Sequence, residues 1–360
     1  MNSRSAVIAV LVAFAMVLPA MPFLASDSDA DTDVFDGYYG KQLTANQKKM
    51  YDAMIAAPDT ITTAGDPETG YYIIVYVDGL VNETEHLKDA KIAWQATKLD
   101  ASSSNYWAYW TWTLGNVTPT VSVVEATATA TYCTLHISYP TQLDNQFVNA
   151  VQHVTDAINA IEITGSTTAE KIKNINSKLA GSPYVYVENN ESHLYANTIY
   201  AIAAENVESE KVYMTSFAYS AVFKALCAKS EVACSQVYGF YGNESKIAAW
   251  NEVVIDSKVY GVDSAVNSTS GSDLWLAAGV YTMGNGDAFS KVHRAFVNNA
   301  TQGFDYSAFT AESLNNNGYA WPQSTDIWAQ ITEYLPWVLV GIICLILAIA
   351  LVIMARKGDI

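Results

Sequence analysis

Hydrophobic residues recur at helical spacing in several segments of the chain. Apolar positions three or four residues apart form one face of an amphipathic helix. In residues 43–57 such a face follows Thr44 and Gln47, which have the spacing of a capping box, and Thr167 and Glu170 repeat that spacing. Helices are therefore expected over residues 43–57, 85–98, 142–163, 192–205, 216–229 and 287–300, and in a segment that begins at Thr167.

Other segments alternate between apolar and polar positions, or are rich in β-branched and aromatic residues, which is typical of strands. Residues 71–77 form one such segment, and residues 105–113 and 120–139 contain more. Further along, Asp256 and Ser257 provide a hairpin turn between two short strands. Three strands, 235–242, 248–256 and 258–265, are expected to form an antiparallel sheet that receives the helix before them.

Both ends of the chain carry apolar runs. Residues 1–25 have a short polar start, an apolar run and small residues near Ala25, which is the layout of a secretory signal peptide. Residues 334–355 are apolar over a length that spans a bilayer, and Arg356 and Lys357 follow directly. The positive-inside rule then predicts a single-pass protein of the cell membrane, with the ectodomain outside and a short C-terminal tail in the cytoplasm. An uncleaved N-terminal anchor is the alternative, and it leaves the ectodomain in the same compartment.

Composition narrows the classes of partner. The chain has a net charge of −17, with 36 acidic against 19 basic residues, so nucleic acid is not an expected partner. The acidic run within residues 26–36 lacks the ligand spacing and turn glycine of a calcium loop and is interpreted as a solvated linker. There is no phosphate-binding loop, no dinucleotide fingerprint and no clustered Cys and His ligand set, so no cofactor and no metal are expected.

Cysteines and glycosylation sequons fit an exposed domain without a disulfide framework. Cys344 lies in the apolar run near the C-terminus and Cys133 in a predicted strand. Cys227 and Cys234 are close enough in sequence to pair across a helix-to-strand turn, and the sequence leaves that pairing open. Six Asn-x-Ser/Thr sequons are possible glycosylation sites: Asn82, Asn116, Asn190, Asn243, Asn267 and Asn299.

The segment 216–263 resembles the core of the transglutaminase-like family, which is related to the papain-type thiol hydrolases. That family has a nucleophile helix of the form C-x-G-Y-A-x-A-F-x-x-L, then V-x-G, H-A-W-N-x-V and W/Y-x-x-V-D. The matching residues here are Tyr219, Phe223, Leu226, Val237, Gly239, Ala249, Trp250, Asn251, Val253, Tyr260, Val262 and Asp263. The resemblance extends over about residues 45–285 and is specific only in 214–264.

The two residues that carry the family's chemistry are replaced. Ser216 stands where the nucleophilic Cys belongs and Ala248 where the His belongs, so only Asp263 remains of the triad. Ala has no proton chemistry, and triad members act as a unit, so the resemblance implies a pseudoenzyme. Ser216 opens a helix and is interpreted as its N-cap residue, and Asp263 as a carboxylate that bonds backbone or hydroxyl groups beside a strand.

Aromatic and amide side chains near these positions are candidate ligand contacts. By the resemblance, Tyr219, Trp250 and Asn251 line the cleft beside the degenerate triad, although packing and hydrogen bonding within the sheet explain Trp250 and Asn251 as well. The aromatic run 106–112 is either a sugar-stacking platform or, as we favour, part of a sheet that packs into its own core. A displaced active site with Cys227 or Cys234 and one of the five histidines is the less favoured alternative.

The expected fold class is α+β, with a transglutaminase-like core in which a helix packs on an antiparallel sheet, preceded by a smaller α+β region and followed by a transmembrane helix. The expected segments are a signal peptide (1–25), an acidic linker (26–42), an N-terminal α+β region (43–141), the transglutaminase-like domain (142–303), a stalk (304–333), a membrane helix (334–355) and a tail (356–360).

Two functions follow from this organisation. The first is a membrane-anchored surface protein whose inactive domain binds a peptide, a glycan or an envelope protein, or has a structural role in the cell coat. The second is a surface cysteine or serine hydrolase, or an acyltransferase, with a rearranged active site. The first explains the joint loss of Cys and His at positions 216 and 248 and is preferred.

Overall fold

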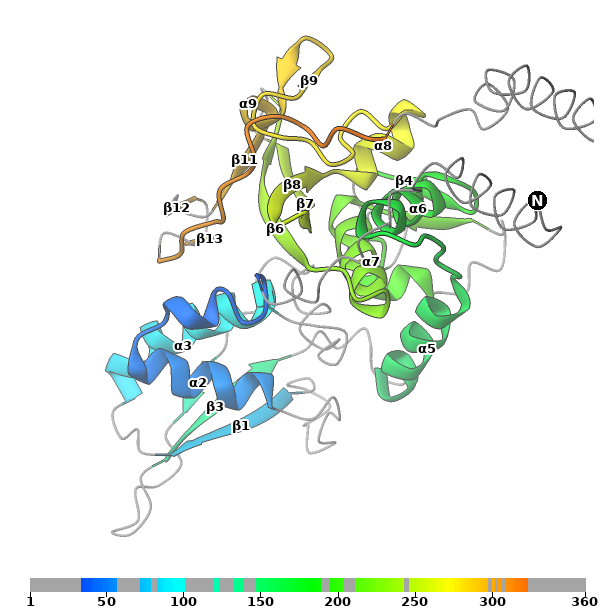
Figure 1. The fold of residues 1–360 in the computed structure, drawn as a ribbon. Helices are drawn as coiled ribbons and strands as arrows, with labels where there is room; N and C mark the ends of the chain where they lie inside the picture. The colour runs from blue at the N-terminus through cyan, green and yellow to red at the C-terminus, as the bar shows by residue number, and fades with distance from the viewer. Residues whose placement is uncertain are drawn as a thin grey trace, which may run out of the picture. The chain divides into compact units, whose positions relative to one another are not determined.

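The computed structural model (Figure 1) describes most of the region between the two apolar ends. The predicted signal peptide, membrane helix and tail lie outside the described residues, and none of the helices that are described is long and apolar enough to cross a membrane. The described residues up to Tyr319 belong to one compact unit. The described ranges are 34–56, 72–78, 83–100, 120–122, 132–138, 147–188, 195–203, 211–242, 246–296, 300–301, 304–305 and 308–322.

The N-terminal part combines two helices with a small antiparallel sheet, as the sequence predicts (Figure 1). After the 3-10 turn η2 (Gly40–Gln42), helix α2 (Ala45–Ile55) begins with the predicted Thr44/Gln47 capping box. Helix α3 (Glu83–Asp100) packs on α2. Strands β1 (Tyr72–Asp78), β2 (Thr120–Ser122) and β3 (Tyr132–Ser138) form a sheet in the order β1-β3-β2.

A buried junction connects this part to the rest of the unit. The Asp100 carboxylate accepts hydrogen bonds from the backbone N–H groups of Tyr39 and Gly40 and from the Tyr51 hydroxyl. The Lys224 ammonium, on helix α7 (Ser216–Lys229), donates to the Leu99 carbonyl at 2.7 Å. Burial lowers the pKa of Lys224 to about 8, against an opposing effect of Asp100.

The helices that follow differ in how well the sequence predicts them. Helix α5 (Phe147–Ala160) lies within the predicted 142–163, and α6 (Thr168–Ala180) has the predicted Thr167/Glu170 capping box. The helix predicted over 192–205 is wrong in its described part, which holds only the 3-10 turn η6 (Ile199–Ile202). Tyr195 has a φ of 70°, and bonds between residues three apart replace the helical pattern.

The main sheet has four antiparallel strands in the order β11-β6-β7-β8. Strands β6 (Cys234–Tyr241), β7 (Lys246–Ile255) and β8 (Lys258–Val262) correspond to the three predicted strands, and α7 packs against β6 and β7. The predicted hairpin turn is confirmed, because Asp256 and Ser257 have φ values of 51° and 59° between β7 and β8. A smaller parallel pair, β4 (Tyr184–Tyr186) and β5 (Val212–Met214), precedes α7.

The fourth strand corrects the prediction of a helix over residues 287–300. In the described part of this segment, residues 287–296 and 300, one helical turn forms, α9 (Phe289–Val292), and the chain then becomes strand β11 (His293–Ala295). Strand β11 pairs with the open edge of β6, where His293 lies opposite Tyr241. Hydrogen bonding to this long-range edge therefore overrides the local helical pattern.

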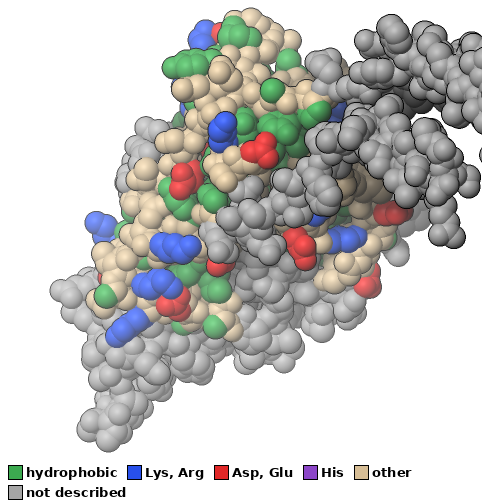
Figure 2. Space-filling model, viewed as in Figure 1, with side chains coloured by type: hydrophobic (Ala, Val, Ile, Leu, Met, Phe, Trp, Pro, Cys, Tyr) green, Lys and Arg blue, Asp and Glu red, His purple; other side chains and the backbone are tan. Residues whose placement is uncertain are grey.

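The remaining elements follow β8. Helix α8 (Ser264–Ser270) leads to the hairpin of β9 (Met283–Gly284) and β10 (Asp287–Ala288), and β12 (Ala300–Thr301) pairs with β13 (Phe304–Asp305). On the face shown in Figure 2, hydrophobic side chains gather over the hairpin, where Tyr281 and Met283 are exposed. Acidic and basic side chains of the described residues are interspersed elsewhere on this face.

Part of the predicted stalk packs on the domain instead of leaving it. Leu314 forms a parallel bridge with Val259, and the N–H of Asn315 donates to the Val259 carbonyl at 2.8 Å. The N–H of Tyr319 donates to Ala277 at 2.9 Å. The stalk assignment is therefore wrong for residues 314–319, because Leu314 and Asn315 pair with the edge of β8 and Tyr319 bonds the loop that follows α8.

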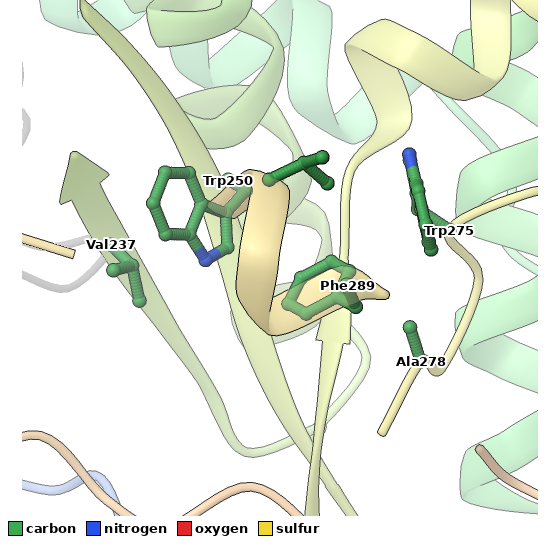
Figure 3. Packing of buried hydrophobic residues seen from close by; sticks show 6 residues of the cluster. Val237, Trp250, Trp275, Ala278 and Phe289 are labelled. Carbon is green, nitrogen blue, oxygen red and sulfur yellow. The ribbon is translucent and has the colours of Figure 1, made fainter. Parts of the chain in front are cut away.

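An aromatic core fills one face of the main sheet. Figure 3 shows Trp250 and Val237 from the sheet with Phe289, Trp275 and Ala278 from the segments that cover it, and all of these side chains are buried. The absence of a side chain at Gly239 and Gly261 leaves room for the rings of this core. A Cβ at Gly239 would lie 2.5 Å from the Trp250 ring and 2.3 Å from a backbone oxygen, and a Cβ at Gly261 would lie 2.3 Å from the Phe289 ring.

Candidate functional site

Ser216 is the first residue of α7, so its predicted place at a helix N-terminus is confirmed. Its predicted role as the N-cap is wrong, because Thr215 occupies that position without a side-chain capping bond. The Ser216 hydroxyl instead accepts a hydrogen bond from the N–H of Ala249 on β7 at 3.3 Å and is 7% exposed. It therefore links the start of the helix to the sheet.

Ala248 and Asp263 lie on the neighbouring part of the sheet. Ala248 is a buried residue of β7 that stands opposite Gly239 of β6. Asp263 follows the last residue of β8 and is the N-cap of α8, where one carboxylate oxygen accepts the N–H of Val266 at 3.0 Å. The predicted backbone-bonding role of Asp263 is therefore correct for one of its two oxygens.

The other oxygen of Asp263 has a partner that sequence reasoning missed. His293 Nε2 lies 3.0 Å from Asp263 Oδ2, and the side chains of the pair are 0% and 2% exposed. His293 comes from β11, 30 residues after Asp263 in the chain, whereas the family's motif places the histidine on β7. Asp263 has no imidazole partner in the motif, because Ala248 stands at the histidine position. In the structure its partner is the imidazole of His293, from strand β11.

Four aromatic rings surround the His293 imidazole. The Phe289 ring stacks on it with centroids 3.9 Å apart, and the rings of Trp250, Trp275 and Tyr241 approach it edge-on at 5.0, 5.5 and 5.0 Å. Three of these rings, Trp250, Trp275 and Phe289, belong to the buried core of Figure 3, and Tyr241 packs against that core. The aromatic enclosure excludes water from the pair and strengthens its electrostatic interaction.

Both ring nitrogens of His293 face hydrogen-bond acceptors. Nε2 faces the Asp263 carboxylate, and Nδ1 lies 3.2 Å from the carbonyl oxygen of Phe289. A neutral imidazole has one N–H donor, so it can satisfy only one of these two acceptors. Both nitrogens of the imidazole are therefore engaged within the fold, one by Asp263 and the other by the Phe289 carbonyl.

This arrangement lacks what a triad requires. In a triad one imidazole nitrogen bonds the carboxylate and the other takes the proton of the nucleophile. Here the second nitrogen of His293 is occupied by the Phe289 carbonyl, and the Ser216 hydroxyl is bonded to Ala249. The side chains of Ser216, Asp263 and His293 can stabilise the fold through these hydrogen bonds. The described contacts provide no route for a proton from Ser216 to His293.

The other predicted site residues are buried. Tyr219, Trp250 and Asn251 are 1%, 3% and 1% exposed, so none offers an accessible cleft surface in this structure. The Asn251 amide donates to the backbone carbonyls of Ser220 and Ser235, which joins α7 to the sheet. Packing and hydrogen bonding within the sheet account for Trp250 and Asn251.

A tyrosine approaches the site from strand β4. Burial raises the pKa of Tyr186 to about 12, and the negative charges of Asp263 and Glu188 act in the same direction. The Tyr186 phenol is therefore neutral at physiological pH. Its ring lies 6.4 Å from that of Tyr219, and Glu188 on the same segment pairs with Lys246 of β7 at 3.1 Å.

The displaced thiol active site finds no support in the placement of the cysteines. Cys227 and Cys234 are free, buried thiols at the C-terminal end of α7 and the start of β6. Cys227 follows Ser216 by eleven residues of helix, a rise of about 16 Å. Cys133 lies on β3. Among the described residues, no group of three or more His, Cys, Asp or Glu side chains is arranged to hold a metal ion.

One predicted glycosylation site is wrong. The Asn267 side chain is 0% exposed, donates to Asn176 at 3.0 Å and accepts the N–H of Trp275 at 2.8 Å. A glycan on this amide would require the core to open. The sequons at Asn82, Asn116, Asn190, Asn243 and Asn299 lie outside the described residues.

Comparison with known proteins gives a weak indication at the level of the fold. No family model matches the chain, and no curated protein matches it. A solved structure described as the crystal structure of a TGase is similar over 59% of this chain and 56% of its own, with 12% sequence identity and a TM-score of 0.26. The chain thus spans about half the length of that structure. At this TM-score the likeness carries no argument about function.

Proposed function

We propose that the protein is a membrane-anchored cell-surface protein whose transglutaminase-like domain is a non-catalytic binding or structural module. Its anchor is the apolar run 334–355, and its partners are sought among peptides, glycans and neighbouring envelope proteins. The motif resemblance in residues 214–264 and the acidic net charge of −17 support this assignment. No cofactor enters the proposal.

One observation carries the non-catalytic interpretation. The imidazole that contacts Asp263 has both nitrogens engaged, and its side chain is fully buried. The His–Asp contact by itself is also compatible with the alternative, a hydrolase with a rearranged active site. Such a hydrolase would also require a nitrogen of His293 that faces a nucleophile, and Ser216 would have to release the N–H of Ala249.

Ser216→Ala tests this interpretation against a matched variant. Ser220→Ala also removes a buried hydroxyl of α7, one that accepts a hydrogen bond from Gln236 at 2.6 Å. Each substitution is expected to lower the free energy of unfolding by about 1–2 kcal/mol, because a buried donor loses its acceptor. Wild type and both variants are expected to show the same background turnover of glutamine-containing peptides and of esters. Turnover that Ser216→Ala alone abolishes would establish catalysis.

The topology of the chain is tested on intact cells. External protease is expected to digest everything before the apolar run 334–355 and to leave a short, protected C-terminal fragment. Immunoblotting against a C-terminal tag measures that fragment, with a cytoplasmic protein as the control for cell integrity. A tag that antibodies reach on unbroken cells would reverse the proposed orientation.

A further inference from the structure

Cys227 and Cys234 lie at the two ends of a tight turn that connects helix α7 to strand β6. Cys227 is in the last turn of the helix and Cys234 is the first residue of the strand. The Cys227 carbonyl accepts the N–H groups of Ser230 and Val232 at 3.0 and 2.9 Å, which folds the connection back on itself. Both side chains are buried, with exposed fractions of 0% and 9%.

The two thiols are neighbours, and both are free. Burial raises the pKa of the Cys227 thiol, and the neighbouring Cys234 raises it further. The attacking species in disulfide chemistry is the thiolate. Because both thiols are buried, their reaction with a disulfide in solution is expected while the turn is open during folding.

We propose that Cys227 and Cys234 form an intramolecular disulfide when the chain folds in an oxidising compartment, and that this disulfide fastens α7 to β6. The location outside the cytoplasm rests on the proposed function, whereas the pairing rests on the turn that brings the two buried cysteines close together. The sequence alone left this pairing open. Disulfides persist in such compartments and are rare in the cytosol.

The reaction needs an oxidant, for which a small-molecule disulfide such as oxidised glutathione suffices. The Cys234 thiolate, on the more exposed of the two residues, attacks one sulfur of the oxidant and releases a thiolate, which takes up a proton. The Cys227 thiolate then attacks the Cys234 sulfur of the mixed disulfide and releases the second thiolate. The protein loses two protons and two electrons, and the oxidant becomes two thiols.

The bond has a specific structural consequence. It closes a short loop between a helix and a strand that pack together, so it restricts the unfolded chain. The Ser216 link lies at the other end of the helix, so the disulfide would hold the end of α7 that this link does not reach. Because both sulfurs are buried, the bond is expected to resist small reductants until the domain unfolds.

Differential alkylation of the full-length protein tests the pairing. The purified protein is unfolded, refolded in a buffer of reduced and oxidised glutathione, alkylated, reduced under denaturing conditions and alkylated with a second reagent before peptide mapping. Cys227 and Cys234 are expected to carry the second label, and Cys133 is expected to carry the first. First label on both residues of the pair, or a disulfide that includes Cys133, would overturn the proposal.

Thermal unfolding provides the second measurement. The oxidised wild-type protein is expected to melt about 5 °C above its reduced form. In the double variant Cys227→Ala/Cys234→Ala the two conditions should give the same melting temperature. A shift of equal size in that variant would overturn the proposal. Both tests use a redox buffer, so their results do not depend on where the protein is located in the cell. A failed protease experiment would contradict the proposed extracellular location, whereas a pair that stays reduced in the buffer would contradict the disulfide.

Discussion

Asp263→Ala is expected to lower the free energy of unfolding by about 3–4 kcal/mol, because a buried hydrogen-bond partner and a helix cap are lost together. The substitution leaves the buried His293 ring with an N–H that has no acceptor, inside an aromatic enclosure that water does not enter. It also removes the N-cap of α8. Denaturant unfolding followed by tryptophan fluorescence measures the effect.

A control and a second variant make this prediction specific. Asp273→Ala removes an exposed carboxylate that accepts one hydrogen bond from the buried Asn176 amide, and its expected cost is about 1–2 kcal/mol because that donor loses its acceptor. In Asp263→Ala/His293→Leu the unpaired imidazole is gone as well, so the double variant should cost less than the sum of its two single substitutions. Strict additivity, or a cost of Asp263→Ala as small as that of Asp273→Ala, would contradict the buried pair.

Glu252→Gln is expected to stabilise the protein at pH 8 by about 1–3 kcal/mol and to flatten its stability between pH 4.5 and 8. Glu252 lies on β7 and is 4% exposed, and its Oε2 atom has no hydrogen-bond partner in the described part of the chain. Burial raises its pKa to about 8, and the nearby carboxylate of Glu312 contributes to the same shift.

The sign of the pH dependence follows from this raised pKa. Between pH 4.5 and 8 the folded protein holds a proton on Glu252 that the unfolded chain has lost, so stability falls as the pH rises through this window. Lys224, with its pKa lowered to about 8, acts in the opposite direction above pH 8. The difference between wild type and Glu252→Gln cancels the contribution of Lys224.

Unfolding curves at several pH values measure this difference. Glu188→Gln is the matched control, because Glu188 is 71% exposed and pairs with Lys246 at the surface. The control is expected to follow the wild-type pH profile, since exposed ion pairs contribute little to stability. A Glu252→Gln profile that declines between pH 4.5 and 8 as steeply as the wild-type profile would show that Glu252 is ionised in the fold.

The elements that the sequence predicts well are those with strong local signals. The capping boxes at Thr44 and Thr167 were found because each places a hydroxyl three residues before a Gln or Glu. The turn residues Asp256 and Ser257 predict the β7–β8 hairpin, and the helical segment of the motif that begins at Ser216 predicts α7.

The errors occur where distant contacts decide the conformation. Residues 293–295 have a pattern compatible with a helix, but they form a strand because they pair with the free edge of β6. Residues 314–319 have the composition of a linker, but they pair with β8 and the adjoining loop. No local pattern encodes these partners, so propensity and periodicity give the wrong element.

His293 is the part of the site that sequence reasoning missed for the same reason. The motif assigns the histidine position to β7, where Ala248 stands, and nothing around residue 293 resembles that motif. The available signal was indirect: a buried Asp at the end of a strand requires a partner. A buried carboxylate requires a partner that donates a hydrogen bond. This requirement does not show which of the five histidines, if any, is that partner.

The central claim, that Ser216 is not a nucleophile, is tested most directly by covalent labelling. Purified full-length protein is incubated with a fluorophosphonate probe for activated serines, and the peptide that contains Ser216 is examined by mass spectrometry. An authentic serine hydrolase serves as the positive control, and denatured protein measures background labelling. Unmodified Ser216 at probe concentrations that fully label the control is the predicted result. An adduct on Ser216 of the folded protein, absent after denaturation, would contradict the non-catalytic account.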